Sequence, residues 1–161
     1  KNEFFFFSVH FDNLGAVARR ESAKLMVSKI KEIAVDRPVI CVGDLNSTPE
    51  TEQIATLETI LNDAYKITEI PPYGPERTSS GFQYDPDRER RMDSLLVART
   101  RQRDEESSGN SAPVRPRSRR IDYIFTSGQV KVLNYGVITD FYGECRFPSD
   151  HFPVVSQVVI E

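Results

Sequence analysis

The sequence predicts an α+β domain in which a mixed β-sheet is flanked by helices. Two continuous apolar runs, residues 4–9 and 39–42, lie on either side of a segment with helical periodicity. A strand, a helix and a second strand in succession imply a crossover, so the sheet should contain parallel or mixed pairing. Three runs rich in β-branched residues favour further strands at 121–126, 130–139 and 154–160.

The length and composition indicate a single domain, or part of one, over residues 1–161. Of the 161 residues, 39% are hydrophobic, which is enough for a moderate core. The formal net charge of −3 does not indicate a nucleic-acid partner, because domains that hold long nucleic acids are usually basic on at least one face. A local basic patch would still allow such a partner.

Signals for membrane insertion, secretion and disulfide formation are weak. The chain has no apolar run of about 18 or more residues, so no membrane span is expected. The N-terminus opens directly into an aromatic strand without a signal peptide ahead of it, which is typical of a fragment and leaves the compartment unknown. Cys41 and Cys145 are far apart and indicate neither a disulfide framework nor a zinc site.

The first strand is expected at residues 4–9, where four phenylalanines precede Ser8 and Val9. The apolar residues are continuous rather than alternating, which is typical of a strand buried on both faces. The strand leads to His10 and Asp12. Asp12 is interpreted as the start of the next loop rather than as a partner of His10.

The next expected elements are a helix over residues 16–34 and a strand over residues 39–42. Apolar residues of the helix recur at i, i+3, i+4 and i+7, with basic residues at other positions. Arg19 and Arg20 are interpreted as surface residues that pair with carboxylates. Gly43 ends the strand.

The middle of the chain contains a second helix, a turn and a charged segment. Residues 48–50 can start a helix, because Pro is tolerated in a first turn, and apolar residues at 54, 57 and 61 give it one apolar face. Residues 71–75 have the composition of a turn. Residues 85–120 combine charged residues with Ser, Gly and Pro, which predicts a mobile surface insertion.

Four polar clusters lie at the ends of predicted strands, where sheets commonly present functional loops. They are VHFD at 9–12, GDLN at 43–46, RIDY at 120–123 and SDH at 149–151. Each cluster alone has a structural explanation, because an Asp after a strand is often a helix cap and a lone His is often a core or surface residue. Together, carboxylates and imidazoles at one edge of a sheet indicate an active site.

The order of these clusters resembles the endonuclease/exonuclease/phosphatase superfamily, whose fold is called DNase I-like. The most diagnostic pieces are GDLN at 43–46 and SDHFPV at 149–154, and the resemblance covers nearly the whole chain apart from the charged segment. It implies a two-layered αβ sandwich, of which this chain would be the C-terminal half. It also implies hydrolysis of a phosphoester by an activated water, with Mg²⁺ or Mn²⁺ as cofactor.

The resemblance implies a role for each matching residue. Asp44 matches the position that orients and deprotonates the attacking water, and the amide of Asn46 can donate a hydrogen bond to phosphate or water. His151 matches the histidine that contacts the scissile phosphate. Asp122 matches the carboxylate that holds this ring in one tautomer, and His10 matches a second phosphate-contacting histidine.

Asp150 matches a metal ligand of the family, and its hard carboxylate oxygen suits Mg²⁺. Asp44 and Asn46 are two residues apart, so on an extended chain their side chains should point to one face. Longer family members have an N-terminal half that supplies a metal-binding Glu, and no Glu of this chain replaces it convincingly. The metal site is therefore expected to be incomplete.

Half of a two-sheet sandwich would expose an apolar sheet face, which soluble monomers seldom tolerate. The N-terminal half of the family fold, self-association or a rearranged fold is expected to cover this face. A run of arginines before the RIDY cluster could favour an anionic substrate, although a solvated loop is the more frequent role of such a run. The run comprises Arg115, Arg117, Arg119 and Arg120.

Three hypotheses about function stay open at this point. The leading one is a metal-dependent phosphoesterase that hydrolyses a small phosphodiester or phosphomonoester rather than long DNA. The second is a non-catalytic binding or assembly module that retains the family motifs. The third is an excised fragment of an ordinary enzyme. The substrate is not predictable, because one set of motifs can serve many substrates through different loops.

Overall fold

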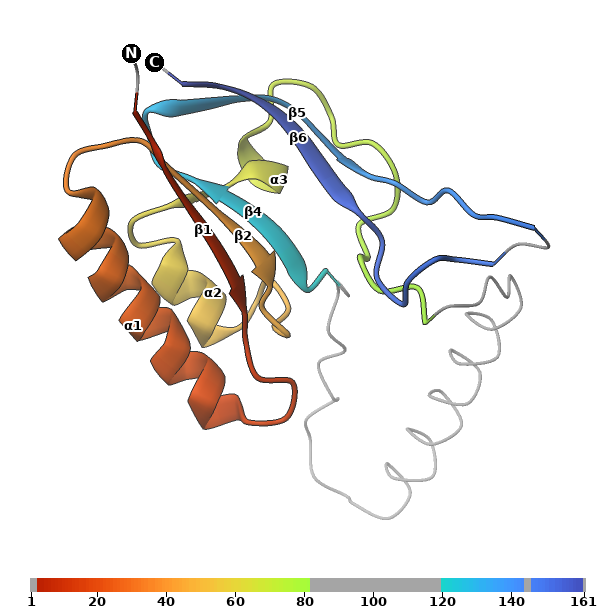
Figure 1. The fold of residues 1–161 in the computed structure, drawn as a ribbon, viewed down its shortest axis with the longest axis horizontal. Coiled ribbons are helices and arrows are strands. Elements are labelled where there is room, and N and C mark those ends of the chain that lie inside the picture. The colour runs from red at the N-terminus through yellow and green to blue at the C-terminus, as the bar shows by residue number, and fades with distance from the viewer. Residues whose placement is uncertain (1–2, 82–119, 144–145, 161) are drawn as a thin grey trace, which may run out of the picture.

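A computed structural model describes residues 3–81, 120–143 and 146–160 of the chain. Of the predicted insertion at 85–120, only Arg120 is among the described residues. No helix in the described part of the chain is long and apolar enough to cross a membrane. In chain order, the elements in Figure 1 are β1 (Phe5–His10), α1 (Ala16–Ala34), β2 (Val39–Asp44), α2 (Glu52–Leu57), β3 (Asn62–Asp63), α3 (Ala64–Ile67), β4 (Asp122–Thr126), β5 (Val130–Val137) and β6 (Val154–Ile160).

Four strands form a mixed sheet in the order β1-β2-β4-β3. β1 and β2 are parallel and are joined by the crossover helix α1, whereas β4 is antiparallel to both β2 and β3. β5 and β6 form a separate antiparallel pair. Helices α1 and α2 lie together on one side of the sheet and the β5–β6 pair lies on the other (Figure 1). The expected mixed sheet flanked by helices is confirmed.

The strand register assigns each side chain of the sheet to one of two faces, because residues paired across neighbouring strands point the same way. Phe7, Cys41 and Phe125 are in register across β1, β2 and β4, and they belong to the main hydrophobic core beneath α1 and α2. Burial raises the pKa of the Cys41 thiol to about 12, so this thiol is an inert part of the core. The buried members of the core are Phe11, Ala23, Ile30, Ala34, Val39, Cys41, Leu45, Ile54, Leu57, Leu61, Tyr123 and Phe125.

The opposite face of β4 packs against the β5–β6 pair. Ile124 of β4 and Val154 and Val158 of β6 pack against a second buried cluster. Within this cluster, the rings of Phe147 and Phe152 meet edge to face with centroids 5.0 Å apart. The buried members are Ala64, Val132, Tyr135, Val137, Phe147 and Phe152. The β5–β6 pair therefore covers the β4 side of this face.

The expectation that the first strand is buried on both faces is wrong. β1 lies at the edge of the sheet, and its residues alternate between half-buried and exposed. Phe5 and Phe7 pack against the main core, whereas Phe4 is 46% and Phe6 is 59% exposed. Within the described part of the chain, β1 pairs only with β2. On the face of the sheet opposite α1 and α2, the described residues leave the part at β1 uncovered, as the exposed ring of Phe6 shows.

The second helix is shorter than its apolar spacing predicts. The residues 48–50 form a turn, in which Thr51 donates its backbone N–H and its hydroxyl to the Thr48 carbonyl, and α2 runs only from Glu52 to Leu57. Leu61 is buried beyond the end of this helix. Arg20 of α1 approaches Glu52 of α2 at 3.7 Å, so its expected pairing with a carboxylate is confirmed.

Two short elements, β3 and α3, are missing from the sequence prediction because neither is long enough to show a period. Asp63 begins α3, and its side chain accepts a hydrogen bond from the Tyr65 N–H at 3.0 Å. The strand bounds also differ, since β2 continues through Gly43 to Asp44, β4 begins at Asp122 and β5 ends at Val137.

Arg120 was predicted to lie in a mobile surface insertion, and this prediction is wrong. The residue is 1% exposed, and its guanidinium donates two hydrogen bonds to Asp63, at 2.9 Å and 2.6 Å. The guanidinium also lies 4.5 Å from the ring centroids of both Tyr65 and Tyr123. Arg120 therefore joins α3 to the start of β4 instead of facing an anionic substrate.

Candidate active site

Three of the predicted site residues lie side by side at one end of the sheet. His10 of β1 is in register with Asp44 of β2, and Asp44 is in register with Asp122 of β4. Side chains in register on neighbouring strands point to the same face with Cβ atoms about 5 Å apart. The three residues thus form a row across the sheet, on the face opposite α1 and α2. We call it the polar row.

A glycine allows β1 and β2 to approach closely beside the polar row. Gly43 has a φ of +148°, and a Cβ atom at this position would lie 1.8 Å from the Val9 carbonyl oxygen. Any other residue would collide with the backbone of β1 and would also be strained. Gly43 therefore fixes the spacing of the two strands immediately before Asp44.

The chain turns sharply after Asp44. The Asp44 carboxylate accepts a hydrogen bond from the Asn46 N–H at 2.7 Å, and Asn46 has a left-handed φ of +45°. The expectation of an extended Asp-x-Asn segment is therefore wrong. The turn nevertheless brings the Asn46 side chain to the polar row. Its amide donates to the Phe11 carbonyl at 2.9 Å and lies 3.3 Å from Nε2 of His10.

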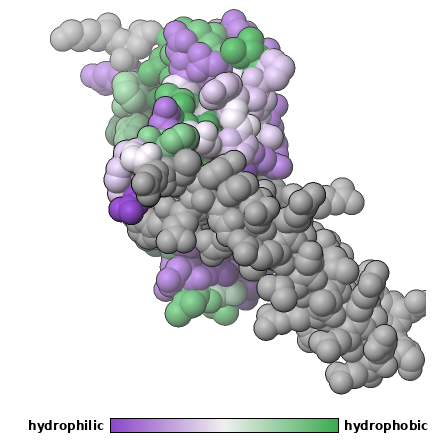
Figure 2. Space-filling view, turned by 90° about the vertical axis from the view of Figure 1, so that its right-hand side faces the viewer, coloured by the Kyte–Doolittle hydropathy of each residue, from purple (hydrophilic) through white to green (hydrophobic). Residues whose placement is uncertain are grey.

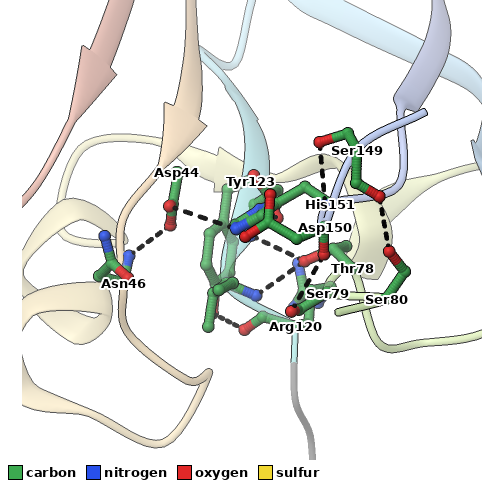
Figure 3. Close-up of polar contacts among 12 residues, drawn as sticks. Asp44, Asn46, Thr78, Ser79, Ser80, Arg120, Tyr123, Ser149, Asp150 and His151 are labelled. Atoms are coloured by element: carbon green, nitrogen blue, oxygen red, sulfur yellow. Dashed lines mark hydrogen bonds and ion pairs between the residues drawn. The ribbon is translucent and has the colours of Figure 1, made fainter. Parts of the chain in front are cut away.

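His151 reaches the polar row from the loop that precedes β6. Its Nδ1 lies 2.8 Å from Oδ2 of Asp122, and its Nε2 lies 3.9 Å from Oδ2 of Asp44 (Figure 3). His10 approaches the same Asp44 oxygen at 3.4 Å through its Nε2. One carboxylate oxygen of Asp44 therefore faces two imidazole rings.

The pKa values of the His151–Asp122 pair reflect burial and mutual contact. Burial alone would lower the pKa of His151, but the hydrogen bond and charge of Asp122, with the charges of Asp44 and Asp150, raise it above its ordinary value. Burial raises the pKa of Asp122, and hydrogen bonds from Thr78 and His151 oppose this rise. The contact fixes His151 with Nδ1 toward Asp122 and leaves Nε2 facing Asp44.

A segment that the sequence analysis did not single out holds this loop in place. Ser79 and His151 form an isolated antiparallel bridge, and the Thr78 carbonyl accepts a hydrogen bond from the Phe152 N–H at 2.7 Å. The Ser80 hydroxyl donates to the Ser149 carbonyl at 2.8 Å (Figure 3). The sequence TSSG at 78–81 carries no periodic pattern or known spacing that could have revealed this role.

Asp150, the predicted metal ligand, has an exposed side chain, and its backbone carbonyl accepts hydrogen bonds from the N–H groups of Ser80 and Gly81. In the described part of the chain, the one group of potential metal ligands is formed by Asp44, Asp122 and His151, whose ligand atoms lie within 4.8 Å of one another. Carboxylate oxygens suit Mg²⁺ or Mn²⁺, but Asp122 and His151 already bond each other. The donors thus fit a divalent ion only in part.

Asp12 has the structural role that the sequence suggested. Its carboxylate accepts hydrogen bonds from the N–H groups of Leu14 and Gly15, just before α1 begins. Its backbone carbonyl accepts a hydrogen bond from Arg19 at 3.0 Å. Arg19 thus contacts a backbone carbonyl here instead of the carboxylate partner that was expected.

The chain is similar to several solved structures. A mannosyl-6-phosphatase from Bacteroides thetaiotaomicron VPI-5482 is 31% identical with a TM-score of 0.72, and the match covers 98% of this chain and 51% of that chain. An endonuclease/exonuclease/phosphatase from Bacteroides vulgatus is 28% identical with a TM-score of 0.67, covering 97% of this chain and 50% of that chain. Among curated proteins, no sequence matches this chain.

A more distant structure has the same fold. D. rerio TDP2 in complex with a single strand DNA product is 15% identical with a TM-score of 0.61, and the match covers 98% of this chain and 57% of that chain. The chain spans about half the length of the two Bacteroides proteins. The expected DNase I-like fold class is confirmed by these neighbours. Since the model of the Endonuclease/Exonuclease/phosphatase family matches residues 3–151, this chain belongs to that family.

Proposed function

We propose that this chain provides the water-activating and phosphate-contacting side of a divalent-metal-dependent phosphoesterase. The observation that carries the proposal is the arrangement around Asp44, where one carboxylate oxygen faces His10 at 3.4 Å and His151 at 3.9 Å. A carboxylate can accept a proton from water, and two imidazoles can contact a phosphate or transfer protons near neutral pH. Family membership supports the same reaction.

In this proposal, each residue of the site has a distinct role. Asp44 orients the attacking water and accepts its proton, while the Asn46 amide donates a hydrogen bond to the water or to the phosphate. His151 contacts the scissile phosphate through Nε2. Asp122 holds the ring through Nδ1, at 2.8 Å. His10, whose side chain is 73% exposed, contacts the phosphate from the sheet edge.

A divalent cation, Mg²⁺ or Mn²⁺, completes the proposed site. Asp150 is the residue of this chain that would hold it, because its side chain is exposed, its carboxylate oxygen is a hard ligand and its charge acts on His151. Such an ion would supply electrostatic stabilisation of the negative charge on the phosphate. Since one carboxylate is too few for a tight site, other ligands would come from water, from substrate or from another protein segment.

The proposed substrate is a small phosphate ester. The mannosyl-6-phosphatase to which this chain is 31% identical supports this choice. The net charge of −3 also favours a small substrate over long nucleic acid, because it gives no general attraction for a polyanion.

The proposed partner is the complementary half of the family fold. This chain spans about half the length of its structural neighbours. It also leaves Phe6 exposed on the face that carries the polar row. A second unit packed on this face would bury this ring and form a further wall of the site.

Hydrolysis assays test the proposed reaction. With Mg²⁺ and the complementary half of the family fold present, the protein should hydrolyse bis-p-nitrophenyl phosphate or mannose 6-phosphate, and Asp44→Asn and His151→Ala should each reduce kcat by about 10²-fold or more. Lys29→Gln, on the outer surface of α1, is the control that should leave the rate unchanged. Unaltered turnover in the Asp44 and His151 variants would contradict the assigned roles.

A further inference from the structure

Thr78 contacts the backbone of Asp122 and that of Phe152, next to His151, and belongs to the element of neither. Its side chain is fully buried. The hydroxyl oxygen accepts hydrogen bonds from the backbone N–H groups of Ile121 and Asp122, both at 3.1 Å. These two bonds hold Ile121 and the first residue of β4, Asp122, to a residue 43 and 44 positions earlier in the chain.

The Thr78 hydroxyl holds the backbone at Asp122. A threonine hydroxyl has two acceptor lone pairs, and the N–H groups of Ile121 and Asp122 occupy both of them. The carboxylate of the same Asp122 lies 2.8 Å from Nδ1 of His151. The backbone that carries this carboxylate is therefore fixed by Thr78.

The backbone of the same residue contacts the other member of the pair. The Thr78 carbonyl accepts a hydrogen bond from the Phe152 N–H at 2.7 Å, and the neighbouring residue Ser79 pairs with His151. Figure 3 shows Thr78 beside His151 and next to the start of β4. Thr78 therefore fixes Asp122 through its hydroxyl and the His151 loop through its carbonyl.

We infer that Thr78 is a positioning residue for the active site: it sets the backbone position of Asp122 and the distance between Asp122 and His151. This inference rests on the proposed function for its catalytic meaning. Thr78 itself is buried and would not touch the substrate. A displaced Asp122 would let the His151 ring rotate away from the polar row, and small displacements of positioned groups can cost about 10²-fold in rate.

Three variants separate the hydroxyl from the bulk of the side chain. Thr78→Val keeps the shape and removes the hydroxyl, whereas Thr78→Ser keeps the hydroxyl. Thr126→Val is the matched control, because Thr126 is also fully buried and its hydroxyl has no hydrogen-bond partner within the described part of the chain. In all three variants, NMR would follow the Nδ1–H proton of His151 and the exchange of the Ile121 and Asp122 amide protons.

In Thr78→Val, we expect the Nδ1–H signal to broaden or disappear and both amide protons to exchange at least about tenfold faster. The value of kcat should fall about 10-fold to 100-fold with little change in KM. Thr78→Ser should restore all of these properties, and Thr126→Val should resemble the unaltered protein. An unchanged Nδ1–H signal and unchanged amide exchange in Thr78→Val would overturn the inference.

A measurement on the unaltered protein covers the case in which Thr78→Val does not fold. The Thr78 hydroxyl proton should exchange slowly enough to give nuclear Overhauser effects to the amide protons of Ile121 and Asp122. A rapidly exchanging hydroxyl would overturn the inference. Because the NMR readouts need no turnover, a protein without phosphoesterase activity would contradict the proposed function and still give a result for Thr78.

Discussion

At the scale of single residues, the contact between Asp122 and His151 gives a pH-dependent property of the site. The hydrogen bond and charge of Asp122 raise the pKa of His151 against the opposing effect of burial. Asp122→Asn removes the charge, so the pKa of His151 should fall, and the ring should lose its proton at a lower pH than in the unaltered protein. NMR titration of the His151 ring measures this shift. Asp36→Asn, in an exposed loop, should have no such effect, and a His151 pKa that does not fall in Asp122→Asn would contradict the prediction.

The ion pair between Arg120 and Asp63 is the second property at this scale. Both side chains are almost completely buried, at 1% and 0% exposure. Removing one partner of such a pair leaves a buried charge without its counterion, so Asp63→Asn should lower the free energy of unfolding by about 3–5 kcal/mol. Urea denaturation measures the change. The control is Glu21→Gln, which breaks an exposed ion pair with Lys24 and should leave the urea concentration at the unfolding midpoint unchanged.

The sequence indicated which candidate residues lie together better than it indicated what holds them in place. Asp44, Asp122 and His151 stand in short motifs at the ends of strands, so a pattern of residue types was enough to select them as candidates. Thr78 and Arg120 act through partners 44 and 57 residues away, at backbone groups and a buried carboxylate. No local pattern records such contacts, and the basic run that contains Arg120 suggested solvent exposure instead.

At the scale of secondary-structure elements, the close approach of β1 and β2 depends on Gly43. A Cβ atom there would lie 1.8 Å from the Val9 carbonyl oxygen. Gly43→Ala should therefore destabilise the protein by about 2–4 kcal/mol through collision and backbone strain, and it should displace Asp44. Thermal unfolding checks this. Gly128→Ala is the matched control, since a Cβ at Gly128 meets no atom within 4 Å, and equal melting temperatures for the two variants would contradict the prediction.

Long elements were predictable and short ones were not. The 19 residues of α1 span several turns, and their apolar period gave the correct bounds. β3 and α3 have two and four residues, too few for any period. The first strand was predicted at 4–9 and lies at Phe5–His10, and its predicted environment is wrong, because a continuous aromatic run can occur in a central strand and in an edge strand.

At the scale of the whole molecule, the main open surface is the part of the sheet at β1 and β2 that no described segment covers on the face opposite α1 and α2. Ile40 of β2 is in register with Phe6, and Val42 is in register with Ser8, so apolar side chains continue from β1 onto β2. β6 forms a second open edge, with Val155 and Val159 exposed at 48% and 44%. Figure 2 shows hydrophobic surface interspersed with hydrophilic surface in the upper part of the view.

This exposed face predicts self-association of the chain in the absence of its partner. Phe6→Thr should increase the monomer fraction in sedimentation velocity experiments, because it removes the most exposed aromatic ring of the open face. Leu25→Thr is a matched control, since Leu25 on α1 is also 59% exposed but lies on the other side of the sheet. Equal effects of the two substitutions would show that the open face has no special role.

The strand register of β1 has a further consequence for folding. The four consecutive phenylalanines at 4–7 offer similar rings to both faces, so a slip of β1 by one residue along β2 would change little in the aromatic part of the strand. The same slip would turn His10 toward the helices and away from Asp44. Only the native alignment places the Val9 carbonyl against the hydrogen of Gly43 rather than against a larger side chain. The contact between Gly43 and Val9 therefore favours the native alignment of an aromatic strand whose own side chains would tolerate a slip.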